Sequence, residues 1–204
     1  MSEERQKKRG QLIVLSGPSG AGKSTVIAQL LTKRENIHFS VSFTTRQPRT
    51  GEINGVNYNF ISREEFETRI AGNEFLEYAE YVGNYYGTSL KVIEEHLEQG
   101  MDVLLEIEVQ GAAKVREKCP DALTIFVIPP SLEDLASRLR GRATDDESVI
   151  QARLAQVKRE YQAIPDYEYL VVNSSAECAV NEIISILTAE DCRVNRRTHF
   201  FEGV

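Results

Sequence analysis

Tryptophan is absent from the 204 residues of this chain, and cysteine and histidine occur only three times each. The cysteines, Cys119, Cys178 and Cys192, are odd in number and widely spaced, so the sequence predicts neither a disulfide framework nor a paired-cysteine metal site. The histidines lack the spacing of a zinc motif. No apolar run reaches the roughly 18 residues of a transmembrane helix, and the charged start MSEERQKKRG is unlike a secretory signal. These absences favour a protein of the reducing cytoplasm.

Charge is unevenly distributed along the chain, whose net charge is -7. The first 50 residues hold nine Lys/Arg and three Asp/Glu, whereas the remainder holds 15 and 28. The acidic total argues against a broad nucleic-acid surface. The basic first quarter is suited to attracting a small anion.

Alternating patterns of buried strands and amphipathic helices predict an α/β fold. The predicted strands are short apolar runs at residues 12–15, 103–109, 123–128 and 169–172. The predicted helices cover residues 23–34, 131–140, 144–162 and 180–187. Helices of this length between strands favour right-handed crossovers and a parallel sheet covered on both faces, which gives three layers.

Residues 42–90 have a different pattern, which predicts a small α+β insertion. Asn54-Gly55 lies between two strand-like segments and predicts a hairpin with a type I′ turn. Gly83-Asn84 predicts a second turn, and Ser62 is a capping residue for a short helix that ends near residue 70.

The most specific motif is the segment 17–25, which reads GPSGAGKST and fits the pattern GxxxxGK[ST]. A predicted strand precedes it and a predicted helix follows, so its backbone N–H groups and the helix N-terminus can surround phosphate oxygens. We expect Lys23 to reach the β- and γ-phosphates and the Ser24 hydroxyl to bind Mg²⁺. The residues predicted to bind ATP are Gly17, Pro18, Ser19, Gly20, Ala21, Gly22, Lys23, Ser24 and Thr25.

A second group of residues indicates the phosphate acceptor. Arg46 and Arg49 each offer a forked donor to phosphate oxygens, and Tyr58 and Tyr86 can add hydroxyl groups. Glu77 lies among aromatic residues and can accept two N–H donors from a guanine edge, which adenine lacks. The alternative is that the arginines are ordinary surface residues and that Glu77 is a solvated residue on a strand face.

The sequence resembles bacterial-type guanylate kinases over about residues 10–188. The phosphate-loop motif is shared with many kinases, but TTRxPRxGExxGxxY followed by GNYYGT is specific to this family. The segments that carry the resemblance are GPSGAGKST (17–25), VSFTTRQPRTGEINGVNYNF (41–60), EFLEYAEYVGNYYGT (74–88), LEIEVQGA (105–112), RLRGRATDDE (138–147) and VVNS (171–174).

The resemblance implies a P-loop NTPase fold and a phosphotransferase activity. ATP with Mg²⁺ would phosphorylate GMP or dGMP, releasing ADP, in purine nucleotide metabolism and GMP recycling. We also expect a cytoplasmic monomer or homodimer that binds neither nucleic acid nor a membrane. The kinase core would comprise residues 1–41 and 91–204, including a helical lid at about 138–160, and residues 42–90 would form the GMP-binding insertion.

The resemblance also assigns residues to roles. The residues expected to bind GMP are Ser42, Arg46, Arg49, Tyr58, Glu77, Tyr86, Thr88, Glu106 and Glu108. The residues expected to be catalytic are Lys23, Arg46, Arg142 and Arg153. Arg142 would lie on the ATP side of the lid, whereas Arg153 and Arg138 would reach the transferring phosphoryl group when the lid closes. Asn173 would lie near the adenine.

Glu106 and Glu108 alternate across Ile107 at the end of the predicted strand 103–109, so we expect them to share a face. They could hold Mg²⁺ through water, contact GMP or form a structural ion pair. Members of the family often carry aspartate at the second position, so Glu108 is a departure from the pattern.

Two other readings compete with a guanylate kinase. A ribose 1,5-bisphosphate kinase, which resembles this family, would not need Glu77 or Thr88 for a base. A guanylate-kinase-like scaffold module would have a degraded phosphate loop, whereas Gly17, Gly22 and Lys23 are all present here.

Overall fold

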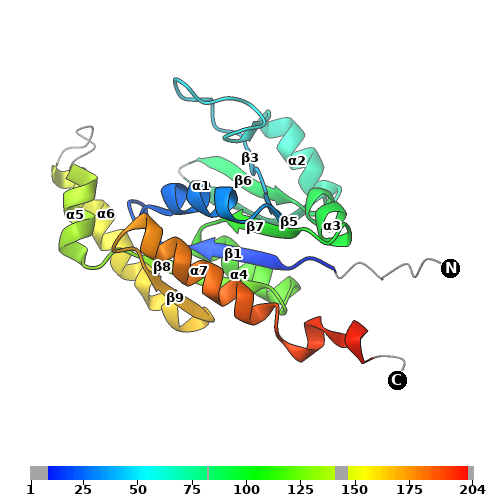
Figure 1. Cartoon of the computed structure of the whole chain (residues 1–204). Coiled ribbons are helices and arrows are strands. Elements are labelled where there is room, and N and C mark those ends of the chain that lie inside the picture. Colours follow the sequence, from blue (N-terminus) through cyan, green and yellow to red (C-terminus); the bar gives the residue numbers. More distant parts are fainter. Residues whose placement is uncertain (1–8, 82, 141–146, 202–204) are drawn as a thin grey trace. The chain divides into compact units, whose positions relative to one another are not determined.

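The computed structural model describes residues 9–81, 83–140 and 147–201 (Figure 1). Contacts group the chain into two units. The first unit holds Ser16–Glu35 and the residues from Ile125 onward, and the second holds Arg9–Leu15 and Asn36–Thr124. Both contain parallel strands and helices, which confirms the predicted α/β class.

In the second unit, three parallel strands have the order β2 (Ile37–Phe39), β7 (Asp102–Glu106) and β1 (Leu12–Ser16). Strand β1 pairs with β7, with Leu12 opposite Val103. All five residues of β1 are buried, and a strand buried on both faces is continuously apolar, as β1 is up to Ser16. Helix α3 (Leu90–Glu98) precedes β7 and helix α4 (Val109–Lys118) follows it. Neither of these helices was predicted from the sequence, and nor was strand β2.

The second unit also contains a four-stranded sheet in the order β4 (Asn59–Phe60), β3 (Phe43–Thr44), β6 (Asn84–Ser89), β5 (Phe75–Tyr81). Helix α2 (Arg63–Ala71) covers it, and Ser62 caps this helix by accepting the N–H of Glu65 at 3.1 Å. Phe66 of α2 is fully buried, with its ring centroid 4.4 Å from that of Phe75 and 5.2 Å from that of Tyr85. Stacking of these rings attaches the helix to the sheet.

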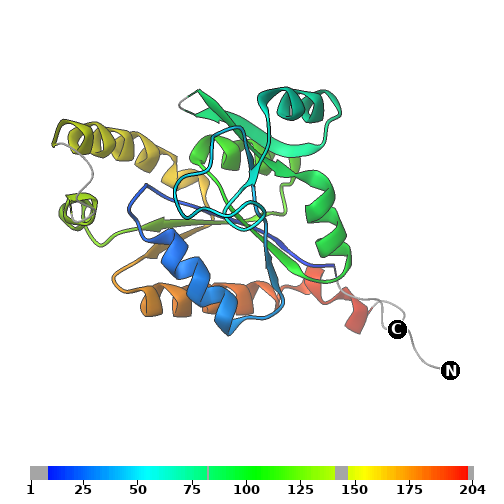
Figure 2. The ribbon, with the colours of Figure 1, turned by 90° about the horizontal axis from the view of Figure 1, so that it is seen from above.

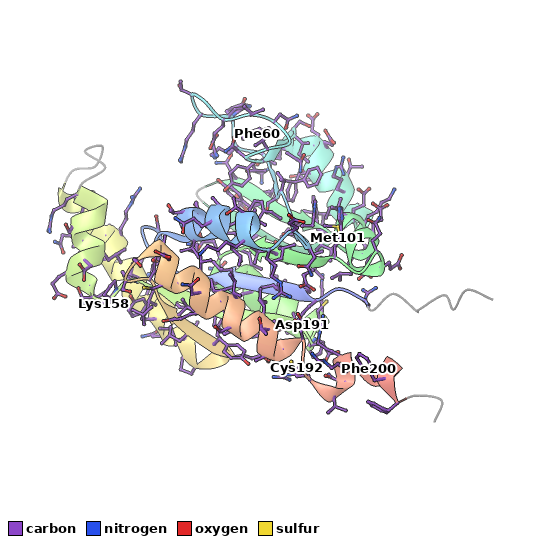
Figure 3. All side chains as sticks on the ribbon, viewed as in Figure 1. Phe60, Met101, Lys158, Asp191, Cys192 and Phe200 are labelled. Carbon is purple, nitrogen blue, oxygen red and sulfur yellow. The ribbon has the colours of Figure 1, made fainter. Side chains whose placement is uncertain are left out.

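In the first unit, β8 (Leu123–Ile128) and β9 (Tyr169–Val172) pair in parallel. Helices α1 (Lys23–Lys33) and α7 (Ala176–Glu190) pack side by side (Figures 1 and 2). Arg34 donates to Asp191 at 2.5 Å and so joins their C-terminal ends; Asp191 is labelled in Figure 3.

Helices α5 (Leu132–Arg140) and α6 (Glu147–Glu160) form a pair in the first unit. Buried Leu135, Ile150 and Val157 form the core between them. Among its described residues, the unit also contains 3₁₀ turns at Tyr161–Asp166, Val194–Arg196 and Thr198–Phe200. None of the helices in the described ranges is both long enough and apolar enough to cross a membrane.

Most elements marked by the sequence are confirmed. Strands lie at Leu12–Ser16, Leu123–Ile128 and Tyr169–Val172, and the turn at Gly83 joins β5 to β6. Ser131 caps α5 as predicted, accepting the N–H of Asp134 at 3.0 Å. The last helix is longer than residues 180–187, because Ser175 caps it by accepting the N–H of Cys178 at 3.2 Å. The predicted start of the 144–162 helix lies outside the described residues, and its regular part ends at Glu160.

Two of the predicted secondary-structure features are wrong. The strand predicted at 103–109 ends at Glu106, because Glu108 becomes the N-cap of α4. Asn54-Gly55 does not form a type I′ turn, since Gly55 has a φ of 78° but Asn54 has no positive φ. The side chain of Asn57 instead accepts the N–H of Ile53 at 2.9 Å, and that of Asn54 accepts the N–H of Phe60 at 2.8 Å. These local hydrogen bonds replace the hairpin ladder.

Candidate functional site

The phosphate loop lies between β1 and α1 and follows the predicted backbone path. Gly17, Gly20 and Gly22 have φ angles of 146°, 91° and 88°, which L-residues rarely adopt. A β-carbon at Gly17 would also lie 2.1 Å from the carbonyl oxygen of Val127, so the loop is packed tightly against the backbone of β8. Glycine at these positions is therefore required by the backbone.

The N-terminus of α1 presents backbone donors without a competing side chain. Gly22 is the N-cap and provides no side-chain cap, and the first turn contains no acidic residue. The ammonium group of Lys23 donates to the carbonyl oxygens of Gly17 at 2.6 Å and Pro18 at 3.2 Å, so it lies across the loop. Ser24 and Thr25 are exposed. The arrangement matches an anion-binding helix N-terminus.

Asn173 supports the phosphate loop from the end of β9. Its side chain is 4% exposed and donates to the carbonyl oxygen of Ala21 at 2.7 Å. Its own N–H donates to the carbonyl oxygen of Ile128 at 2.7 Å. These contacts connect the loop to the two strand ends, while contact between Asn173 and an adenine stays a prediction.

A bidentate ion pair fixes one of the predicted acceptor-site arginines in the second unit. Both terminal nitrogens of Arg46 lie 2.9 Å from carboxylate oxygens of Glu52, and one of them also donates to the carbonyl oxygen of Gln47 at 2.7 Å. The same carboxylate accepts the backbone N–H of Arg49 at 2.7 Å. Glu52 therefore organises both arginines, yet it was given no role from the sequence. The sequence feature that could have identified Glu52 is its place in the TTRxPRxGE pattern.

Aromatic rings surround the guanidinium of Arg46. The guanidinium carbon lies 5.3 Å from the ring centroid of Tyr58 and 5.7 Å from that of Phe60, labelled in Figure 3. The rings of Tyr58 and Tyr86 meet edge to face, with centroids 5.9 Å apart. Arg46, Tyr58 and Tyr86 are thus brought together as predicted, whereas Arg49 is exposed at the edge of this group.

Neighbouring charges and burial shift the pKa values of Arg46, Glu52 and Tyr58 in this cluster. The hydrogen bonds from Arg46 and from the N–H of Arg49 lower the pKa of Glu52 to about 2, and Glu52 in turn raises the pKa of Arg46. Burial raises the pKa of Tyr58, and the nearby Tyr86 and Glu106 raise it further. At neutral pH the cluster therefore combines the guanidinium of Arg46, the carboxylate of Glu52 and the neutral phenol of Tyr58.

Glu77 is a buried carboxylate on β5, as the base-reading hypothesis requires. It is 5% exposed and pairs across the sheet with Thr88 on β6, whose hydroxyl donates to its Oε1 at 2.6 Å. Burial raises the pKa of Glu77, while the Thr88 hydrogen bond and the charges of Lys114 and Lys118 oppose that rise. The structure thus brings together, on one strand pair, two of the three residues predicted to read the guanine; the third, Ser42, lies elsewhere.

The other predicted site residues lie on several different elements. Ser42 is half-buried just before β3, and its carbonyl oxygen accepts the N–H of Asn59 at 2.9 Å. Glu106 and Glu108 do not share a strand face: the first ends β7 and is half-buried, and the second is exposed at the start of α4. Arg153 is half-buried on α6.

Two lid arginines cannot be placed in this way. Arg142 lies outside the described residues, and only the backbone of Arg138, within α5, is described.

Comparison with known proteins gives consistent results over nearly the whole length. A family model described as guanylate kinase matches residues 9–190. The guanylate kinase of Desulfitobacterium hafniense is 49% identical over 199 residues, covering 98% of this chain and 100% of that protein. That of Halalkalibacterium halodurans is 52% identical over 191 residues, covering 94% of each. The crystal structure of guanylate kinase from Anaplasma phagocytophilum, 38% identical, has a TM-score of 0.78 and covers 95% of this chain and 92% of that one.

Proposed function

Because this chain belongs to the guanylate kinase family, we propose that it transfers the γ-phosphoryl group of ATP to GMP or dGMP, releasing ADP and the corresponding diphosphate. The family resemblance found in the sequence is confirmed, and the chain is a phosphotransferase of that class. The location and assembly expected from the sequence, a cytoplasmic monomer or homodimer, stay predictions.

The phosphate loop provides the donor half of the proposed reaction. Successive N–H groups at the start of α1 would hold the β- and γ-phosphates, and the ammonium of Lys23, already across the loop, would offset their charge. Asn173 would keep the loop in place through its hydrogen bond to Ala21.

Mg²⁺ fits this loop because Ser24, in the first turn of α1, presents an exposed hydroxyl oxygen, a ligand type that Mg²⁺ prefers. Residues 9–81, 83–140 and 147–201 contain no group of three or more His, Cys, Asp or Glu that could hold a metal. The remaining ligands would therefore be phosphate oxygens and water. When bound, the ion would neutralise part of the phosphate charge.

The residues grouped around Arg46 in the second unit provide the acceptor half of the proposed reaction. Arg46, Arg49, Tyr58 and Tyr86 would hold the GMP phosphate, and Glu77 with Thr88 would read the base. Guanine presents two adjacent N–H donors to a carboxylate, whereas adenine presents an acceptor at the corresponding ring nitrogen. The buried Glu77–Thr88 pair is the observation that carries the proposal for GMP, since phosphate loops occur in many kinases.

The chemistry needs alignment and charge neutralisation more than proton transfer. An oxygen of the GMP phosphate attacks the γ-phosphorus, and the bond between that phosphorus and the bridging oxygen of ADP breaks. The attacking oxygen is already largely deprotonated at neutral pH, so no general base is required. Catalysis then consists of bringing two polyanions into line and stabilising the charge with lysine and arginine.

A coupled assay of ADP release tests the proposal directly. ATP would be supplied with GMP, dGMP, AMP or ribose 1,5-bisphosphate as the acceptor. We expect turnover with GMP and dGMP and little with AMP. Turnover with ribose 1,5-bisphosphate in place of the guanine nucleotides would show instead that the chain is a sugar-phosphate kinase.

Replacing Glu52 by glutamine is expected to raise the KM for GMP by roughly 10-fold or more, with a smaller change in kcat. The variant removes the charge that orients Arg46, although it keeps the size of the side chain. Because the pKa of Glu52 is about 2, the wild-type ion pair is fully formed at neutral pH.

Glu67→Gln is the matched control for this prediction, since it breaks an exposed Arg63–Glu67 pair on α2. We expect it to leave the KM for GMP unchanged. Equal KM values for the Glu52 and Glu67 variants would show that Arg46 needs no positioning by Glu52.

A further inference from the structure

Helix α4 packs against β5 along the stretch that carries Glu77. The ammonium group of Lys114 donates to the carbonyl oxygen of Tyr78 and lies 4.9 Å from the centroid of that ring. The ammonium group of Lys118 donates to the carbonyl oxygen of Leu76. The two carbonyl groups flank Glu77 in the strand, so α4 is attached to β5 on both sides of this carboxylate.

Gly111 lies on the same face of α4, three residues before Lys114 and seven before Lys118. It is buried, and a β-carbon built on it would lie 2.7 Å from Oε2 of Glu77 and 3.2 Å from the carboxyl carbon. Gly111 lies within a regular helix and is not among the residues with positive φ, so its backbone does not require glycine. The position requires glycine because of the space that Glu77 occupies.

A side chain at residue 111 would displace the carboxylate. A β-carbon is fixed to the helix backbone, whereas the end of the Glu77 side chain can rotate. That rotation would alter the hydrogen bond that Oε1 accepts from Thr88 at 2.6 Å. The group that moves would thus be the one that distinguishes the purine bases.

We propose that Gly111 is a specificity-determining position, which holds the Glu77 carboxylate in its base-reading orientation by having no side chain. This inference rests on the proposed function, because it assumes that Glu77 reads guanine. Gly111 acts through Glu77 and is therefore a positioning residue. A displaced carboxylate would lose hydrogen bonds to guanine, so GMP would bind more weakly. The penalty for binding AMP would also be smaller, because adenine would leave the displaced carboxylate less unpaired. Both changes would lower the preference for GMP over AMP.

The test is Gly111→Ala, measured by steady-state kinetics with GMP and with AMP and by calorimetric titration with GMP. We expect the KM and Kd for GMP to rise roughly 10- to 100-fold, the kcat to change by less than about 3-fold, and the GMP/AMP ratio of kcat/KM to fall by at least about 10-fold. Thermal stability should not fall in proportion, since alanine favours a helix more than glycine does. Neither KM nor the GMP/AMP ratio depends on the folded fraction of a sample.

Gly72→Ala is the matched control, because a β-carbon there would meet only the exposed Glu74 side chain, at 3.3 Å, and nearby backbone. This variant should leave the KM for GMP and the GMP/AMP ratio of kcat/KM unchanged. Glu77→Asp, which is one methylene shorter, supplies a rescue. Combined with Gly111→Ala, it should bind GMP more tightly than the product of the two single effects predicts.

The possible outcomes separate the two claims. An unchanged KM and GMP/AMP ratio in Gly111→Ala, or strictly multiplicative effects in the double variant, would overturn the role of Gly111. Failure of the wild-type protein to phosphorylate GMP would overturn the proposed function itself.

Discussion

Lys23→Ala is expected to lower kcat by more than about 1,000-fold and to leave the fold intact. The Lys23 ammonium lies across the phosphate loop, 2.6 Å from the carbonyl oxygen of Gly17, where the terminal phosphates of ATP would bind. Its charge would oppose the repulsion between the donor and acceptor phosphates as the new bond forms. Alanine is a good helix former at the first position of α1, so the unfolding temperature should change little.

Lys33→Ala provides the matched control, because Lys33 lies in the last turn of the same helix and is exposed. It removes an equal charge about 15 Å along the helix axis. We expect near wild-type kcat from this variant. Retention of more than about a tenth of the wild-type rate in Lys23→Ala would contradict the role given to the phosphate loop.

Glu77→Gln is expected to lower the GMP/AMP ratio of kcat/KM by about 100- to 10,000-fold. Glutamine keeps the shape of the buried side chain, but it replaces one acceptor oxygen by an N–H donor. The variant therefore loses a bond to guanine and can donate to the ring nitrogen of adenine. Glu80→Gln, on the exposed face of the same strand, should leave the ratio unchanged.

The pH dependence of GMP binding gives an independent check on Glu77. Burial raises the pKa of this carboxyl group, and only the ionised form accepts both guanine donors. Affinity for GMP in the wild type should therefore fall as the pH drops through the raised pKa. Glu77→Gln should lack this pH dependence.

An unchanged GMP/AMP ratio of kcat/KM in Glu77→Gln would show that guanine is recognised elsewhere.

The fold was predictable from the sequence where a strand or loop depends on local chemistry. The apolar residues of β1 and β8 identify buried strands, and those of β9 identify a strand of which only Val171 is buried. The glycines of the phosphate loop adopt the φ angles that the motif implies. The end of β7 was not predictable, because Ile107 continues the apolar pattern of the strand. Only the start of α4 at Val109 shows that Glu108 leaves the sheet.

The candidate site was predicted to a similar extent. Arg46, Tyr58 and Tyr86 are close in space as their residue types suggested, and Glu77 meets Thr88 across the β5–β6 pair. The supporting residues were not predicted, because their roles depend on tertiary contacts. Glu52 is one carboxylate among many until it is seen on Arg46, and Gly111 is an ordinary helical glycine until α4 is seen against Glu77.

Calorimetric titration of the wild-type protein with GMP and then with AMP shows whether the unaltered site distinguishes guanine from adenine. We expect saturable binding of one GMP per chain and binding of AMP that is at least about 100-fold weaker. Equal affinities for the two nucleotides, or no binding of GMP, would contradict recognition of guanine by the buried carboxylate of Glu77.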